Sequence, residues 1–273
     1  MSWLRNFGKV LIIFLIAFAI VQSGLANNII DAVRYQDIEK LDLSGVVTNV
    51  LSSTGLVPKP PTYSPTITTN NPTSSPTPTG AGYYDRAYEW KYKGTTWTYA
   101  LSIPTSTYNY YRNLDHTGRD YAKYISDQGS RKSLSALAKT FREGGSTKGY
   151  SDSENVMNVI AFVQSLPYTS DSVTTGHDEY PRYPIETLVD NGGDCEDSSL
   201  LTAGILREMG YGVILIGPPG HIAVGVKGGE EIEGTYYSYN GAKYYYLETT
   251  GSGWKIGKMP DAYRNTKARI IPL

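Results

Sequence analysis

The most constraining feature of the sequence is the stretch 191–221, which reads NGGDCEDSSLLTAGILREMGYGVILIGPPGH. It contains the only cysteine of the chain, Cys195, and one of its three histidines, His221. Asp194 is a favourable N-cap residue, and apolar residues spaced by three and four positions follow it. This pattern predicts a helix over 195–209 with one buried face and with Cys195 in its first turn.

The first turn of a helix alters the chemistry of a thiol. Unpaired backbone N–H groups and the positive end of the helix dipole stabilise a thiolate there. Glu196 and Asp197 act in the opposite direction, so the sequence leaves the sign of the pKa shift open. A single cysteine excludes an internal disulfide, and a lone cysteine is most often a small core residue. The position of Cys195 at a capped helix start, ahead of a histidine, favours a reactive thiol instead.

The apolar run 213–216 predicts a buried strand that returns along this helix. A helix over 195–209 is about 22 Å long, and six extended residues span about 20 Å. The chain therefore returns to the level of Cys195 as it passes Pro218-Pro219-Gly220. If the strand packs along the helix, we expect His221 to lie next to the thiol.

Two further strands are predicted over 221–227 and 244–250. If they pair in antiparallel fashion, Glu248 lies beside His221, where its carboxylate can fix the tautomer of the imidazole and stabilise its cation. This pairing requires the second strand to lie between the first and a short strand at 235–239.

Other features leave the third member of the site open. Asn240-Gly241 is a strong hairpin signal, and a simple three-stranded meander through it would place Glu248 at the wrong end of its strand. Glu233 and Asp261 are the alternative partners for His221.

The motifs GGDCEDSS, GPPGHIAVGV and YYYLETT resemble the transglutaminase-like superfamily of papain-type cysteine enzymes, especially its exported archaeal and bacterial members. FVQSLPYTSD and EYPRYPIETLVDNGGDCED extend the resemblance, which covers about residues 150–254. It implies an α+β fold in which a helix bundle carrying the cysteine packs on an antiparallel sheet carrying the histidine and the acid. It also implies a triad of Cys195, His221 and Glu248, although the family more often has aspartate in third place.

The same resemblance implies acyl transfer through a thioester on the cysteine. An extracytoplasmic protease or amidase is favoured over a cross-linking transglutaminase, and its substrate would be a protein or peptide, with cell-surface or wall peptides among the candidates. The alternative is a catalytically inactive surface module that binds protein or glycan. A serine hydrolase is excluded because the chain has no GxSxG motif.

Two further groups are candidates for the site. Gln164 is a candidate for polarising the substrate carbonyl, as a side chain upstream of the nucleophile does in papain-type enzymes, with the backbone N–H of Cys195 as the other donor. Asp194, Glu196 and Asp197 suggest calcium, which some bacterial relatives bind near the nucleophile, but helix capping explains the same residues. No other cofactor is expected, and the absence of CxxC and HExxH argues against zinc.

The N-terminal part of the chain predicts export. Residues 1–26 contain basic residues and then an apolar run over 10–21, which is typical of a signal peptide or an N-terminal membrane anchor. Residues 27–51 are expected to form a juxtamembrane segment, and 52–82 a Pro/Thr/Ser-rich linker that cannot bury a core. We therefore expect a secreted or membrane-anchored cell-surface protein whose catalytic domain, 83–273, lies outside the cell.

Within this domain the patterns place helices before the final strands, which predicts an α+β fold. Alternating residues on either side of Lys93-Gly94 predict a hairpin. Helices are expected over 104–113, 119–128, 131–143 and 152–165. Gly144-Gly145 is expected to end the third of them, and 168–181 to form a polar surface loop beside the site.

Composition limits the partners. A net charge of −1 gives no electrostatic basis for binding nucleic acid. The 24 tyrosines suit either a half-buried sheet or a face that binds sugar or peptide. His116 and His177 occur in polar segments and are expected to be solvated.

Overall fold

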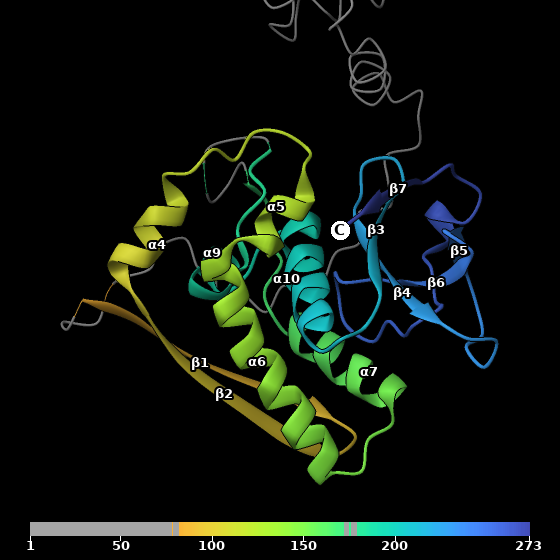
Figure 1. Ribbon diagram of the computed structural model, residues 1–273, viewed down its shortest axis with the longest axis horizontal. Coiled ribbons are helices and arrows are strands. Elements are labelled where there is room, and N and C mark those ends of the chain that lie inside the picture. Colours follow the sequence, from red (N-terminus) through yellow and green to blue (C-terminus); the bar gives the residue numbers. More distant parts are fainter. Residues whose placement is uncertain (1–77, 79–81, 172–174, 176–178) are drawn as a thin grey trace, which may run out of the picture. The chain divides into compact units, whose positions relative to one another are not determined.

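The computed structural model describes residues 78, 82–171, 175 and 179–273 (Figure 1). The predictions for 1–26 and 27–51 lie outside the described residues, as does that for 52–82 apart from Pro78 and Gly82. Within the described ranges no helix is both long enough and apolar enough to span a membrane. The predicted α+β class is confirmed, because helices and an antiparallel sheet make up the described fold.

The predicted hairpin is formed by β1 (Tyr83–Tyr92) and β2 (Thr95–Pro104). Its turn residues, Lys93 and Gly94, have positive φ angles of 46° and 75°, which suit the right-handed twist of paired strands. Trp90 stacks on Trp97 across the pair, with ring centroids 6.0 Å apart. Alternate side chains of β1 are buried against the helices, so the hairpin covers one side of the helical core (Figure 1).

The helices of the described part are α4 (Thr105–Arg112), α5 (Tyr121–Ser126), α6 (Gln128–Thr147), α7 (Asp152–Val163), α9 (Pro184–Asp190) and α10 (Cys195–Glu208). The first four and α10 confirm the predicted helices, with changes at their ends, whereas α9 was not predicted. The prediction that Gly144-Gly145 ends α6 is wrong. A Cβ atom at Gly144 would collide with Trp97 and one at Gly145 with Asn155, so these glycines permit close packing inside the helix.

The central element of the fold is α10. It contacts α5, α6, α7 and α9, and also β3 (Val213–Gly217) and β4 (Ala223–Gly228). Figure 1 shows it between the other helices and the sheet. Its apolar side chains, including Leu200, Leu201 and Ile205, are fully buried. This packing fixes the position of the helix end that carries Cys195.

The sheet of the C-terminal half has the order β5-β6-β4-β3-β7, with all neighbouring strands antiparallel. The remaining strands are β5 (Tyr236–Tyr239), β6 (Ala242–Leu247) and β7 (Arg269–Pro272). Asn240 and Gly241 form the predicted turn between β5 and β6. Because β6 also pairs with β4, the sheet contains both the hairpin and the strand order that Glu248 requires. The edge strand β7 was not predicted.

Candidate active site

Cys195 is the first residue of α10, as predicted. The side chain of Asp194 caps the helix by accepting hydrogen bonds from the N–H groups of Glu196 at 3.1 Å and Asp197 at 3.5 Å. Asp197 in turn accepts a bond from the Asp194 N–H at 3.2 Å, which completes a capping box. No described group accepts a hydrogen bond from the N–H of Cys195, so this donor is free to bind a substrate atom.

The thiol of Cys195 donates a hydrogen bond to Oε2 of Glu196 at 2.8 Å. Removal from water, followed by the charges of Glu196 and Asp194, raises the pKa of the Cys195 thiol well above its usual range, against a smaller effect of the Ile222 backbone. The sequence left the direction of the pKa shift of Cys195 open, and in the structure the pKa is raised. In this state the thiol is protonated at neutral pH, and no hydrogen bond between Cys195 and His221 occurs among the described residues.

His221 follows the turn at 218–220 and lies two residues before β4, so it precedes the strand that it was expected to open. Its side chain is 8% exposed and stacks on Tyr263, with ring centroids 4.9 Å apart and planes 4° apart. Nε2 lies 3.0 and 3.1 Å from the two carboxylate oxygens of Glu248. Because an ionised carboxylate can only accept, Nε2 carries the proton and Nδ1 is the basic nitrogen of the neutral ring.

Glu248 directly follows β6 and is 2% exposed. Besides His221, its carboxylate accepts hydrogen bonds from the Tyr246 hydroxyl at 2.9 Å and from the N–H groups of Thr249 and Thr250, each at 3.0 Å. Burial raises the pKa of Glu248, but the hydrogen bond and charge of His221 and the Thr250 donors outweigh it, and the pKa is lowered. The carboxylate is therefore ionised at neutral pH and holds the imidazole in one orientation.

Cys195 and His221 line one open cleft of about 740 Å³. Its walls come from the start of α10, the turn before His221, the segment leading into β7, and the aromatic residues Tyr121 and Tyr168. The predicted return of the chain is confirmed, because β3 packs along α10 and delivers His221 to the same cleft as the thiol. Glu248 does not line the cleft and reaches the site through its contact with Nε2 of His221.

Gln164, the side chain expected to polarise the substrate carbonyl, does not line the cleft that contains the thiol. Nε2 of Gln164 donates to the carbonyl oxygen of Glu248 at 2.9 Å, and its Oε1 accepts from the N–H of Gly253 at 3.0 Å. Gln164 is absent from the cleft lining and instead fixes the loop that follows the acid. Among the described residues neither alternative acid bonds to His221: Glu233 is exposed, and Asp261 pairs with Arg264 of its own turn.

The three acidic residues suggested for calcium each have a partner within the protein. Asp194 caps α10, Glu196 accepts from the thiol, and Asp197 forms an ion pair with the buried Arg182. Ligand atoms of Asp194, Cys195 and Glu196 lie within 4.8 Å of one another, a spacing that a cation could bridge. Helix capping and these partners account for the residues without an ion, and the calcium site stays a prediction.

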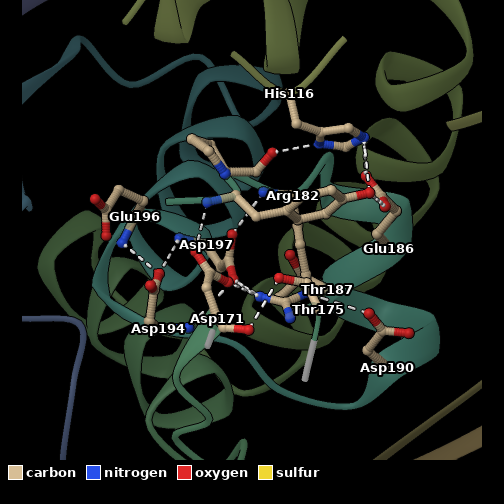
Figure 2. Close-up of polar contacts among 12 residues, drawn as sticks. His116, Asp171, Thr175, Arg182, Glu186, Thr187, Asp190, Asp194, Glu196 and Asp197 are labelled. Atoms are coloured by element: carbon tan, nitrogen blue, oxygen red, sulfur yellow. Dashed lines mark hydrogen bonds and ion pairs between the residues drawn. The ribbon is translucent and has the colours of Figure 1, made fainter. Parts of the chain in front are cut away.

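A buried arginine beside the site escaped the sequence analysis. Figure 2 shows the side chain of Arg182 among Asp171, Asp190 and Asp197. Its Nη1 lies 2.8 Å from Asp171 and contacts Asp197, and its Nε lies 3.1 Å from Asp190. Asp171 is only 4% exposed and Tyr180 only 8%, so the prediction of a polar surface loop over 168–181 is wrong for these residues. The one signal in the sequence that Arg182 is buried was its position between the apolar and aromatic residues of YPRYP.

His116 belongs to the same buried layer, and the prediction that it is solvated is wrong (Figure 2). Its Nδ1 lies 2.8 Å from the carbonyl oxygen of Pro181 and its Nε2 3.0 Å from that of Tyr111. Glu186 lies 3.7 Å from Nε2, and burial raises the pKa of this carboxyl to about 8. His177 lies outside the described residues.

Comparison with models of known protein families and with curated proteins finds no match to this chain. An assignment of function therefore rests on the residues and the geometry of the cleft.

Proposed function

We propose that the chain is an extracytoplasmic cysteine enzyme that transfers acyl groups through a thioester. Cys195 is its nucleophile, His221 its base, and Glu248 the acid that orients the base. The observation that carries the proposal is a single cleft lined by a thiol at a helix N-terminus and by an imidazole whose Nε2 is held by a buried carboxylate. A cysteine with a purely structural role requires neither partner.

This arrangement also supports the resemblance to the transglutaminase-like superfamily. In the papain-type core that the resemblance implies, the cysteine begins a helix and the histidine and the acid belong to an antiparallel sheet. Here Cys195 begins α10, His221 precedes β4 and Glu248 follows β6. The finer assignment of the α+β fold to this core is part of the proposal.

In the proposed reaction, Nδ1 of His221 accepts the thiol proton while the sulfur of Cys195 bonds to a substrate carbonyl carbon. The carbonyl π electrons move onto the oxygen, which becomes an oxyanion. When the oxyanion collapses, the bond to the leaving amine breaks and His221 gives its proton to the amine nitrogen. A thioester on Cys195 results, and Glu248 stays ionised because it stabilises the imidazolium.

The hydrogen bond from the Cys195 thiol to Glu196 favours general-base catalysis over a thiolate–imidazolium pair that exists before substrate binds. Cys195 donates to Glu196, and its raised pKa keeps the sulfur protonated before substrate binds. On this mechanism the thiol turns from Glu196 towards His221 when a carbonyl group enters the cleft. The proton then leaves the sulfur only as the new bond forms.

We favour hydrolysis of the thioester over transfer to a second amine, because the cleft is open and admits water. The substrate is a protein or peptide, with cell-surface and wall peptides as candidates for an exported chain. The second candidate function is an inactive surface module that binds protein or glycan. The raised pKa of Cys195 is the observation that favours it.

Fluorogenic peptide mixtures, incubated with the full-length protein in the presence and absence of a primary amine, test these functions. Peptide cleavage that is lost in Cys195→Ala supports a hydrolase, and amine incorporation that is lost in the same variant supports a cross-linking enzyme. Peptide or glycan binding that is equal in both proteins, without turnover in either, would contradict the enzyme and support the binding module.

A further inference from the structure

Tyr168 is held beside the nucleophile by backbone contacts. It forms a parallel bridge to Gly193, and the N–H of Thr169 donates to the carbonyl oxygen of Gly193 at 2.9 Å. Gly192 approaches Pro167 so closely that a Cβ atom would lie 2.5 Å from the Pro167 carbonyl oxygen. The backbone of Tyr168 is therefore paired with Gly193, two residues before Cys195 in the chain.

The side chain of Tyr168 shares the cleft with the thiol. It lines the same cavity as Cys195 and His221 and is 50% exposed, so a bound substrate can reach it. Partial burial, followed by the charges of Cys195 and Asp194, raises the pKa of Tyr168, which keeps the phenol protonated at neutral pH. Its hydroxyl has no hydrogen-bond partner among the described residues and is a free donor.

Attack of a thiol on a carbonyl group places a negative charge on the carbonyl oxygen, and the site must supply hydrogen-bond donors that stabilise this oxyanion. An oxyanion is usually held by two donors, and the free N–H of Cys195 supplies one. Gln164, the side chain expected to supply the second, is bound to the backbone of Glu248 and Gly253 instead. A second donor must therefore come from another group at the cleft wall.

We propose that Tyr168 is a further catalytic residue, whose phenolic hydroxyl donates a hydrogen bond to the substrate oxyanion opposite the backbone N–H of Cys195. The inference rests on the proposed function, because it assigns a role within the attack of Cys195 on a carbonyl. No proton is transferred by Tyr168: the hydrogen bond strengthens as charge gathers on the oxygen and weakens when the thioester forms. The residue thereby lowers the barrier to addition without altering the thiol itself.

Two reagents separate this role from an effect on the thiol. Iodoacetamide alkylates sulfur by direct displacement at carbon and forms no oxyanion, whereas p-nitrophenyl acetate acylates sulfur through a tetrahedral oxyanion. Other nucleophiles also react with these reagents, so both rates are corrected for a blank without the thiol and then report on Cys195, the only cysteine of the full-length chain. Blank rates come from Cys195→Ala. Tyr168→Phe removes one hydroxyl and keeps the ring, and Tyr236→Phe, at a 44% exposed position on β5, is the matched control.

We expect Tyr168→Phe to lower the acylation rate by a factor on the order of 10² while the alkylation rate stays the same. Tyr236→Phe should leave both rates unchanged. Equal acylation in wild type and Tyr168→Phe would overturn the inference, and so would a parallel loss of both rates, which would place the effect on the thiol. If wild type itself is not acylated above the Cys195→Ala blank, it is the proposed function that fails.

Discussion

The hydroxyl of Ser199 lies 3.0 Å from the hydroxyl of Thr249 and 3.0 Å from the carbonyl oxygen of Ile222. Ser199 is one helical turn beyond Cys195, Ile222 follows His221, and Thr249 follows Glu248. One buried serine thus connects the three segments that carry the proposed triad. The relative positions of thiol, imidazole and carboxylate depend on this contact as well as on the core packing.

Replacement of Ser199 by alanine should therefore affect stability and acylation together. It leaves the buried carbonyl of Ile222 and the Thr249 hydroxyl with one partner fewer, which we expect to cost about 1–3 kcal/mol in urea unfolding. Acylation by p-nitrophenyl acetate should slow as well. Ser198→Ala is the control, since among the described residues this hydroxyl bonds only to the carbonyl oxygen of Asp194, the N-cap of the same helix. Unfolding free energies that are equal for Ser199→Ala and wild type would contradict the connecting role.

Glu196 should control the pH dependence of the thiol. Its carboxylate is one of the causes that raise the pKa of Cys195, after removal from water, so Glu196→Gln should lower that pKa and increase the thiolate fraction near neutral pH. We expect iodoacetamide to react severalfold faster at pH 7 to 8, with the whole rate profile shifted towards lower pH. Glu233→Gln, in an exposed loop, should leave the profile in place. A shift of Glu196→Gln towards higher pH would show that the carboxylate does not oppose the thiolate.

Glu248→Gln should separate the charge of the acid from its shape. The amide can occupy the same buried space, but it cannot stabilise an imidazolium as a carboxylate does. Acylation should fall by about 10²- to 10⁴-fold.

In wild type the lowered pKa of Glu248 means that its contribution to stability is present above the ordinary glutamate pKa and is lost as the pH falls through the folded-state value. Acid unfolding curves followed by circular dichroism should be flatter for the variant, and an unchanged acylation rate would remove Glu248 from the triad.

Arg182 should be a major determinant of stability. It is fully buried and paired with Asp171, Asp190 and Asp197, so Arg182→Met leaves buried carboxylates without their cation. We expect a loss of about 3–5 kcal/mol in the free energy of unfolding. The pair of Arg131 with Glu208 is the comparison, because the side chain of Arg131 is 60% exposed, and Arg131→Met should cost about 1 kcal/mol or less. Equal losses in the two variants would contradict a structural role for the buried cluster.

The sequence predicted those parts of the site that depend on local signals. Three predicted features depend on a few neighbouring residues, and all three are present in the structure: the cap at Asp194, the apolar run that forms β3, and the turn at Asn240-Gly241. The return of the chain to Cys195 followed from the lengths of one helix and one strand. Glu248 could be proposed, but only the pairing of β6 with both β4 and β5 fixed its place beside His221.

The features that were missed depend on contacts between distant segments. The burial of Arg182 is decided by carboxylates at Asp171 and Asp197, and that of His116 by backbone carbonyls such as Pro181. Neither contact leaves a periodic pattern in the sequence. Gly144-Gly145 was interpreted as a helix end because its local preference favours one, whereas in the structure the helix continues and the two glycines pack against Trp97 of the hairpin and Asn155 of α7.

The central claim is that His221 activates Cys195, and the most direct test is the rate of p-nitrophenolate release at pH 7 by wild type and by His221→Ala. This pH lies below the ordinary thiol pKa of about 8.5, so an unassisted thiol reacts slowly. We predict a burst equivalent to the single cysteine in wild type and a rate lower by about 10²- to 10⁴-fold in His221→Ala. Equal rates in the two proteins would contradict the catalytic pair and leave a surface module with an unassisted thiol.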